Sequence, residues 1–378
     1  MAKWNYVKIG DVCTVERGGS PRPIDKFITD DPNGINWIKI GDATDSMYIT
    51  ETAQKIIPEG MKKSRYVQPG DFLLSNSMSF GRPYILKIDG CIHDGWLVLR
   101  DNGGVFDKRF LYYYLSSPST YQKFKNMAVG GVVNNLNSDM VRGVTVPIPK
   151  MEEQIEIVQT LDNVSNLIFL RKQQLAKLDE LVKARFVEMF GDRWANNLEW
   201  PQKPLKDCAT FYNGKAHEQV VDEHGEYILV TSKCIASDQR EYRRTNTLLF
   251  PLQCGDICMV MSDVPNGRAL AKCMMITEDN RYTLNQRICC LRGYSLHTVF
   301  FMHVLNRHEY LLSFNDGDSQ TNLRKDDLLA CPIILPPMDL QEQFAAFVKQ
   351  TDKSKVAVQK ALDEAQLLFD SLMQKYFE

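Results

Sequence analysis

Two long stretches of the chain carry apolar residues at the alternating three- and four-residue spacing of a narrow helical stripe. In the first stretch, from about Glu152 to Phe190, the stripe consists of Ile157, Leu161, Val164, Ile168, Leu175, Leu178, Val182 and Met189. In the second stretch, from about Asp339, it consists of Phe344, Val348, Thr351, Val358, Leu362, Ala365, Phe369, Leu372 and Tyr376. Such stripes are typical of helices that pair along a coiled-coil seam. We therefore expect two long helices that pack on each other.

The segment before each long helix shows a different pattern. Short runs of β-branched and aromatic residues, bounded by Gly, Pro, Asn and Asp, predict strands and tight turns. The sequences "GDFLL" and "GDICMVM" are typical of a turn that leads into a buried strand. Residues 108–127 and 296–314 return to helical spacing. Each segment is therefore predicted to be a globular α+β domain.

The two halves of the chain repeat one order of motifs, with an offset of about 190 residues. "QPGDFLLSNS" (68–77) matches "QCGDICMVMS" (253–262), and "GR" follows each of them, at Gly81–Arg82 and Gly267–Arg268. "NNLNSDM" (134–140) matches "TNLRKDD" (321–327). The drifting offset is typical of loop insertions around a shared framework. We interpret the chain as a tandem duplication.

The repeat extends to the start of each long helix. "VPIPKMEEQ" (146–154) matches "LPPMDLQEQ" (335–343), and an alignment without gaps pairs Pro147 with Pro336 and Gln154 with Gln343. The expected organisation is a first domain over 1–150, a first helix over 151–191, a second domain over 192–338 and a second helix over 339–378.

The length of the helices indicates a purpose for this arrangement. A helix of roughly 38 residues measures about 57 Å at ~1.5 Å per residue. Two similar domains held apart by such rods suit the reading of two similar objects at a fixed separation, and DNA half-sites are such objects. About 57 Å corresponds to roughly 17 base pairs at ~3.4 Å per step along a strand.

Composition and charge limit the other classes of protein. The formal net charge is −2; residues 1–150 carry 19 Lys or Arg against 15 Asp or Glu, and residues 200–338 carry 15 against 16. DNA binding would therefore depend on local basic patches. The N-terminal "MAKWNYVKIG" does not resemble a signal peptide, and no stretch approaches the ~20 apolar residues of a membrane span. We expect a cytoplasmic protein, with its ten cysteines as free thiols.

The paired motifs "VVNNLNSDMVRGVTVPIPKMEEQ" and "SQTNLRKDDLLACPIILPPMDLQEQ", each after a "GD…GR" segment, resemble the specificity subunit of type I restriction-modification enzymes. The resemblance covers nearly the whole chain. It implies two target recognition domains in pseudo-twofold tandem, each reading half of a bipartite double-stranded DNA sequence, joined by two helices in an antiparallel coiled coil. It also implies two methyltransferase (modification) subunits and two restriction/translocase subunits as partners. S-adenosylmethionine, ATP and Mg²⁺ would be bound by those partners, and the chain itself would be non-catalytic.

The sequence lacks the motifs of a free-standing enzyme. Its Pro336–Pro337 pair is followed by Met338, not by the aromatic residue of an adenine methyltransferase motif, and no Gly-rich phosphate loop is present. The acidic pairs Asp316/Asp318 and Asp326/Asp327 could hold Mg²⁺, but turn and helix-cap roles are the more frequent ones. The CxxxC spacing of Cys254 and Cys258 does not match a zinc site. We expect no catalytic residue and no metal site.

Candidate DNA contacts come from a Gly/Pro loop, "RGGSPRP" (17–23), from the recurring polar loops near "GR", and from basic clusters. They are Arg17, Ser20, Arg22, Lys62, Lys63, Arg65, Asn76, Ser77 and Arg82 in the first domain, and Lys215, Arg240, Arg243, Arg244, Ser262, Asn266 and Arg268 in the second. Solvated turns and charged faces are the alternative interpretation. At the level of the whole chain, the alternative is a scaffold that presents two protein-binding domains on a coiled coil, without DNA specificity.

Overall fold

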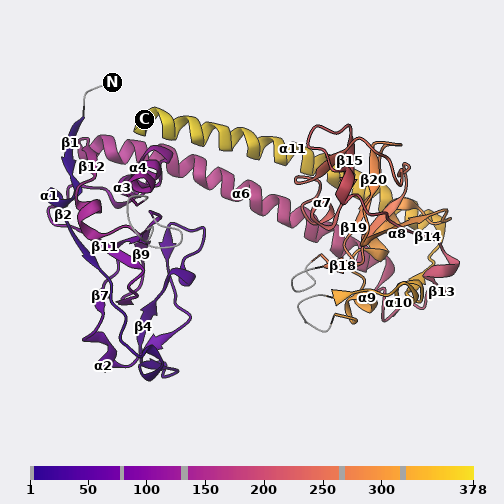
Figure 1. Ribbon diagram of the computed structural model, residues 1–378, viewed down its shortest axis with the longest axis horizontal. Helices are drawn as coiled ribbons and strands as arrows, with labels where there is room; N and C mark the ends of the chain where they lie inside the picture. The colour runs from indigo at the N-terminus through magenta and orange to yellow at the C-terminus, as the bar shows by residue number, and fades with distance from the viewer. Residues whose placement is uncertain (1–3, 77–80, 129–134, 264–268, 316–320) are drawn as a thin grey trace. The chain divides into compact units, whose positions relative to one another are not determined.

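A computed structural model describes residues 4–76, 81–128, 135–263, 269–315 and 321–378 (Figure 1). The chain divides into two compact units. Unit 1 comprises Met1–Lys172 and Lys360–Glu378, and unit 2 comprises Gln173–Gln359. Each unit mixes strands with helices, so the prediction of two α+β units in tandem is confirmed.

Unit 1 is built on two five-stranded sheets and one strand pair. Its strands are β1 (Asn5–Lys8), β2 (Cys13–Arg17), β3 (Ile28–Thr29), β4 (Ile35–Ile38), β5 (Tyr48–Ile49), β6 (Lys55–Ile56), β7 (Arg65–Val67), β8 (Phe72–Ser75), β9 (Pro83–Leu86), β10 (Gly90–Ile92), β11 (Trp96–Asp101) and β12 (Thr145–Ile148). The sheet orders are β2-β11-β8-β9-β5 and β3-β6-β4-β10-β7, and β1 pairs with β12. The short helices are α1 (Ile9–Val12), α2 (Pro58–Met61), α3 (Lys108–Ser116), α4 (Pro118–Ala128) and α5 (Ser138–Arg142).

Unit 2 repeats this sheet order with its own strands. They are β13 (Gln202–Pro204), β14 (Thr210–Asn213), β15 (Tyr227–Val230), β16 (Arg243–Thr245), β17 (Ile257–Val260), β18 (Ser262–Asp263), β19 (Cys273–Met275), β20 (Tyr282–Leu284), β21 (Ile288–Arg292), β22 (Thr321–Asn322) and β23 (Pro332–Ile334). The order β14-β21-β17-β19 corresponds to β2-β11-β8-β9, β16-β15-β20 to β6-β4-β10, and β13-β23 to β1-β12. The helices are α7 (Ser232–Ala236), α8 (Thr298–Leu305), α9 (Glu309–Leu312) and α10 (Lys325–Leu329).

Two 40-residue helices, α6 (Met151–Phe190) and α11 (Met338–Phe377), each contribute one segment to each unit. In unit 1, Val164 and Ile168 of α6 pack with Ala365 of α11. In unit 2, Phe186 of α6 contacts Phe344 of α11, with ring centroids 5.4 Å apart. Each unit therefore completes its own core with a segment of both helices. None of the helices in the described residues is apolar over enough of its length to span a membrane.

The predicted seam positions differ in their burial. Leu161, Val164, Ile168, Val182 and Val358 are buried, whereas Leu175, Leu178, Leu362, Phe369 and Leu372 are half-buried. Arg171 and Arg185 interrupt the stripe of α6, and both are half-buried. The guanidinium of Arg185 lies over the ring of Phe347, 5.8 Å from its centroid, so its aliphatic stem covers apolar surface.

The alignment that pairs Gln154 with Gln343 is wrong by two residues. In unit 1, the buried Gln154 accepts a hydrogen bond from the Asp107 amide through Oε1 and donates to the Pro149 carbonyl through Nε2 (3.1 Å). In unit 2 the same bonds are made by Gln341, which accepts from the His297 amide and donates to the Pro336 carbonyl (2.8 Å). The structural partner of Gln154 is therefore Gln341.

Candidate nucleic-acid interface

The repeated "GD" turns hold a partly buried ion pair in each unit. In unit 2, Arg292 donates two hydrogen bonds to the carboxylate of Asp256, from Nε (2.7 Å) and from Nη2 (2.6 Å), and Asp256 also accepts from the Gln253 amide. In unit 1, Arg100 and Asp71 form the corresponding pair, with Nη2 and Oδ2 3.0 Å apart. Bidentate pairing of this kind fixes geometry. These four residues therefore hold the sheet frame and are not available to a ligand.

In unit 1, the "RGGSPRP" loop folds over Asp94, which follows β10. The Ser20 hydroxyl donates to Asp94 Oδ1 (2.8 Å), and His93 Nε2 lies 2.9 Å from the same oxygen. Arg22 Nη2 lies 3.5 Å from Oδ2, and Arg17 Nε donates to the main-chain carbonyl of Asp94 (3.1 Å). The structure thus brings three of the predicted residues to one residue, Asp94, that the sequence did not single out: Ser20 and Arg22 contact its carboxylate, and Arg17 contacts its main-chain carbonyl.

Asp94 is held in its charged form by these neighbours. Burial alone raises the pKa of its carboxyl group, but the Ser20 hydrogen bond and the charges of His93, Arg17 and Arg22 outweigh burial and bring the pKa below its ordinary value. The side chain of Arg22 is nevertheless 82% exposed. The loop therefore presents a charge-compensated polar surface that retains exposed hydrogen-bond donors.

The other candidates of unit 1 lie in different environments. Lys62 is exposed, Lys63 lies 5.2 Å from the centroid of the Phe27 ring, and Arg65 pairs with Glu16 (3.2 Å). Asn76 is buried and donates to the main-chain carbonyl of Asp94 (2.9 Å), Arg82 is exposed, and Ser77 lies outside the described residues. Lys62 and Arg82 therefore remain open to a ligand, whereas Asn76 supports the Asp94 loop.

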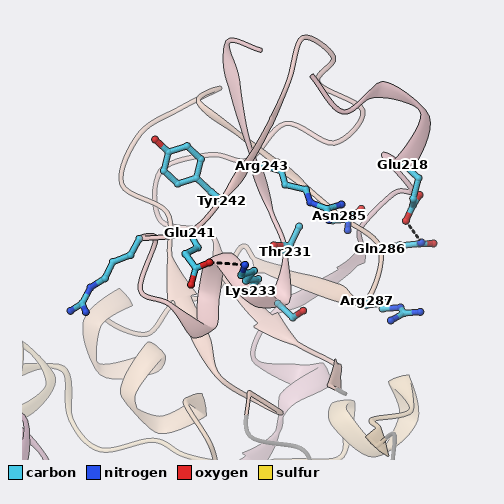
Figure 2. A pocket seen from close by; sticks show the side chains of 11 residues that line it. Glu218, Thr231, Lys233, Glu241, Tyr242, Arg243, Asn285, Gln286 and Arg287 are labelled. Carbon is cyan, nitrogen blue, oxygen red and sulfur yellow. Dashed lines mark hydrogen bonds and ion pairs between the residues drawn. The ribbon is translucent and has the colours of Figure 1, made fainter. Parts of the chain in front are cut away.

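Unit 2 contains an open cavity of about 760 Å³ beside the ends of β15 and β20 (Figure 2). Its lining residues are Glu218, Thr231, Ser232, Lys233, Arg240, Glu241, Tyr242, Arg243, Asn285, Gln286 and Arg287. Two acidic groups in the lining have internal partners: Glu241 pairs with Lys233 (2.6 Å), and Glu218 accepts a hydrogen bond from Gln286. Among the described residues, no carboxylate lies within ion-pair distance of Arg240, Arg243 or Arg287. The cavity therefore offers three guanidinium groups to an acidic ligand.

Some candidates of unit 2 have structural roles. Arg244 donates through Nη1 to the Gly225 and Glu226 carbonyls, and the buried Ser262 lies in a strand pair with Asn322. Lys215 is exposed, and its amide donates to the Leu284 carbonyl. Asn266 and Arg268 lie outside the described residues.

The sequence alignment pairs Arg82 with Arg268, but the backbone hydrogen bonds of the two units give Arg82 a different counterpart. The Ser75 amide donates to the Arg82 carbonyl, and at the corresponding strand position the Val260 amide donates to the Lys272 carbonyl. Lys272 is therefore the counterpart of Arg82, in place of the predicted Arg268. Its ammonium group pairs with Asp238 (2.8 Å).

The site has the features of a binding surface. Within the described ranges, no three His, Cys, Asp or Glu side chains are grouped in a way that could hold a metal ion. The ten cysteines are free, and burial raises the pKa of the Cys258 and Cys273 thiols well above its ordinary value. These thiols are protonated and unreactive at neutral pH. The exposed guanidinium groups of both units instead suit hydrogen bonds to phosphates and base edges.

The comparisons with known proteins identify the class. The model of the type I restriction modification DNA specificity domain matches residues 1–180 and 197–365, so the chain belongs to this family. It is 23% identical to the type I restriction enzyme MjaIX specificity subunit of Methanocaldococcus jannaschii, over 98% of this chain and 92% of that protein. The chain is therefore a DNA-recognition subunit of the type I restriction-modification class, and it is non-catalytic.

Solved structures show the same fold. The type I restriction-modification S subunit from M. genitalium is 14% identical, with a TM-score of 0.55 over 100% of this chain and 96% of that one. A chain from a study of complex assembly and conformational transition of the type I restriction-modification system is 17% identical, with a TM-score of 0.61 over 100% of this chain and 98% of that one. Specificity subunits of this class bind DNA and assemble with methyltransferase and restriction subunits.

Proposed function

We propose that the chain recognises a bipartite double-stranded DNA target, with one unit reading each half. The observation that carries this proposal is the repetition of one sheet order in both units, β2-β11-β8-β9 and β14-β21-β17-β19, with the same Arg–Asp pair fixing each copy. Two copies of one frame with different exposed side chains suit two half-sites of different sequence. The scaffold alternative has no comparable support, because the unit 2 cavity presents three guanidinium groups without an ion-pair partner among the described residues, and such groups suit phosphates and guanines.

We further propose that α6 and α11 form an antiparallel coiled coil that sets the gap between the half-sites. The pairing of Ile168 with Ala365 in unit 1, and that of Asp179 with Lys355 in unit 2 (2.7 Å), support the antiparallel direction. The domains would then be 1–150 and 192–338, with spacer helices 151–191 and 339–378.

The proposed partners are two modification subunits and two restriction/translocase subunits, in the cytoplasm and away from any membrane. S-adenosylmethionine, ATP and Mg²⁺ would be bound by those subunits. Exposed apolar side chains on the helices support docking of another protein: Phe169 and Leu170 on α6 are each 57% exposed, and Leu367 on α11 is 69% exposed. Apolar side chains on a helix surface are typical of a contact that another subunit covers.

The proposed DNA contacts follow the availability of each candidate. Arg240 and Arg243 in unit 2, and Lys62 and Arg82 in unit 1, are exposed and suit phosphates. The "RGGSPRP" loop suits base edges or phosphates through Arg22.

The test is to purify the chain in complex with its modification subunit and to map adenine methylation on a random DNA library. The proposal expects two fixed half-sites with an unspecified gap between them. The chain alone should bind the same sites without methylating them. A single uninterrupted site, or no sequence preference, would contradict the proposal.

A further inference from the structure

The connection between β20 and β21, residues Asn285–Arg287, occupies the place in unit 2 that His93–Gly95 occupies in unit 1. The neighbouring backbone holds both connections by the same hydrogen bonds. The bonds are Gly18 to Trp96 and Asn76 to Gly95 in unit 1, and Gly214 to Ile288 and Met261 to Arg287 in unit 2. Both connections are three residues long and lead from the parallel strand pair of one sheet into the second strand of the other sheet, β11 in unit 1 and β21 in unit 2.

The side chains on this shared backbone differ completely. Unit 1 carries His-Asp-Gly, and both arginines of the "RGGSPRP" loop contact Asp94. Unit 2 carries Asn-Gln-Arg, in which Gln286 bonds to Glu218 and Arg287 is exposed. By contrast, the Arg–Asp pair that fixes the frame is the same in both units. A constant backbone with exchanged polar side chains is the arrangement that two domains with different half-sites require.

The backbone of Arg287 has an unusual conformation. Its φ is 72°, in the left-handed region that disfavours residues with a Cβ atom. Glycine would adopt this conformation without strain. Strained non-glycine residues are concentrated at functional sites, so the side chain at this position calls for an explanation beyond folding.

The surroundings of Arg287 leave its side chain open to a ligand. It lines the cavity of about 760 Å³ in unit 2 together with Arg240 and Arg243. Figure 2 labels Arg243 and Arg287 in this lining. Its carbonyl accepts from the Met261 amide, which anchors the main chain while the guanidinium group extends outward. A rigid main chain with an exposed guanidinium group is pre-organised to place two parallel N–H donors on a flat acceptor.

We propose that Arg287 is a specificity-determining residue of unit 2 and reads a guanine through its O6 and N7 atoms. This inference rests on the proposed function. Guanine is the base whose major-groove edge offers two acceptors at the spacing of a guanidinium fork. Arg240 and Arg243, in the same cavity, neutralise the phosphates beside it. Arg287 thus supplies the sequence information that those two phosphate contacts lack.

The experiment uses the full chain in complex with its modification subunit, S-adenosylmethionine and a duplex library randomised at both half-sites. The variants are Arg287→Gly, which removes the backbone strain with the side chain, and Arg287→Lys, which keeps the charge but loses the fork. The matched control is Arg281→Ala, because Arg281 is an exposed arginine of the same unit that pairs with Glu278 and does not line the cavity. Melting temperatures establish that each variant is folded, and Arg287→Gly should melt at or above the wild type.

The expected result is confined to one position of one half-site. There the wild type requires guanine, Arg287→Gly loses roughly tenfold or more of that preference, and Arg287→Lys keeps an intermediate preference. The base preferences at the other half-site, and those of the Arg281→Ala variant at both half-sites, should match the wild type. An unchanged guanine preference in Arg287→Gly, or a uniform loss of methylation at all sequences, would overturn the inference and leave the proposed function intact. A wild-type complex without sequence preference would overturn both.

Discussion

Arg193 joins the turn after α6 to the C-terminal end of α8. Its guanidinium group donates to the carbonyls of His303 (2.6 Å), Val304 (3.0 Å) and Arg307 (2.9 Å) and pairs with Glu309 (2.8 Å). Carbonyls at the end of a helix lack intrahelical partners, and one planar group satisfies several of them here.

We therefore expect Arg193→Lys to destabilise unit 2 by about 2–3 kcal/mol, because an ammonium group cannot make these bonds together. Hydrogen exchange measured on the whole chain should show faster exchange in α8 and α9 and unchanged exchange in β8 and β11. Arg281→Lys, at an exposed ion pair in the same unit, provides the control. Equal exchange in the two variants would show that Arg193 is dispensable.

His308 makes the stability of unit 2 depend on pH. Its side chain is fully buried, and Nδ1 accepts from the Tyr310 amide. Burial and, to a smaller degree, the charge of Arg193 lower the pKa of His308 from 6.5 to about 4, against the opposing charges of Glu309 and Asp192. The unfolded chain therefore binds a proton below pH 6.5 that the folded chain takes up only near pH 4.

Unit 2 should therefore have its full free energy of unfolding above pH 6.5. This free energy should fall as the pH drops toward 4, and His308 should contribute up to about 1.4 kcal/mol per pH unit to the loss. In His308→Asn the side-chain oxygen keeps the helix cap and the titrating group is removed, so the loss between these pH values should become shallower. Urea unfolding across this range measures the slope. A slope unchanged by the substitution would assign the acid sensitivity to other groups, such as the half-buried His303, whose pKa is also lowered by its partial burial.

The candidate site could be predicted from the sequence only in part, and the reason lies at the scale of single residues. Arginines look alike in a sequence, but their roles depend on partners far away along the chain. Arg244 donates hydrogen bonds to the carbonyls of Gly225 and Glu226, whereas its neighbour Arg243 lines an open cavity. Asp94 and Arg287 escaped notice because neither belongs to a basic cluster or a repeated motif. The signal that could have found them is their place in the three-residue connection that precedes a strand of the repeated sheet.

At the scale of elements, a buried glutamine fastens the start of each long helix to its unit. Gln154 Nε2 donates to the carbonyls of Pro149 and Val105 (3.0 Å), and its Oε1 accepts from the Asp107 amide. We expect Gln154→Leu to cost unit 1 about 3 kcal/mol, because three backbone groups, one buried and two partly buried, lose their partner. Chemical denaturation, with Gln159→Leu at an exposed position of α6 as control, tests this. Similar stability in both variants would contradict the assigned role.

The elements themselves were largely predictable, because their signals are local. Apolar spacing indicated both long helices, and the Gly-Asp turns indicated β8 and β17. The register of the repeat was not predictable at the proline exits. Pro149 and Pro336 both accept from a buried glutamine, but each sits in a proline-rich segment that aligns equally well two residues away. Only the hydrogen bonds distinguish the two registers.

At the scale of the whole molecule, the proposed spacer can be lengthened without altering either unit's sheets. On α6, Leu175 lies between Ile168, which packs with Ala365, and Asp179, which pairs with Lys355. The facing position on α11 is therefore near Val358. Four residues inserted after Leu175 and four after Val358 add about 6 Å to both helices at ~1.5 Å per residue. A four-residue insertion unwinds a coiled coil only locally, so most of the seam stays in register.

If the helices set the gap, the double insertion should keep both half-site sequences and lengthen the gap by one or two base pairs, at ~3.4 Å per step. Methylation maps of the variant in complex with its modification subunit measure this directly. The control inserts the same four residues after Gly104, an exposed loop position where a side chain would meet no neighbour, and should leave the gap unchanged. A double-insertion variant that methylates only the parental spacing, or that changes a half-site at constant spacing, would show that the gap is set elsewhere.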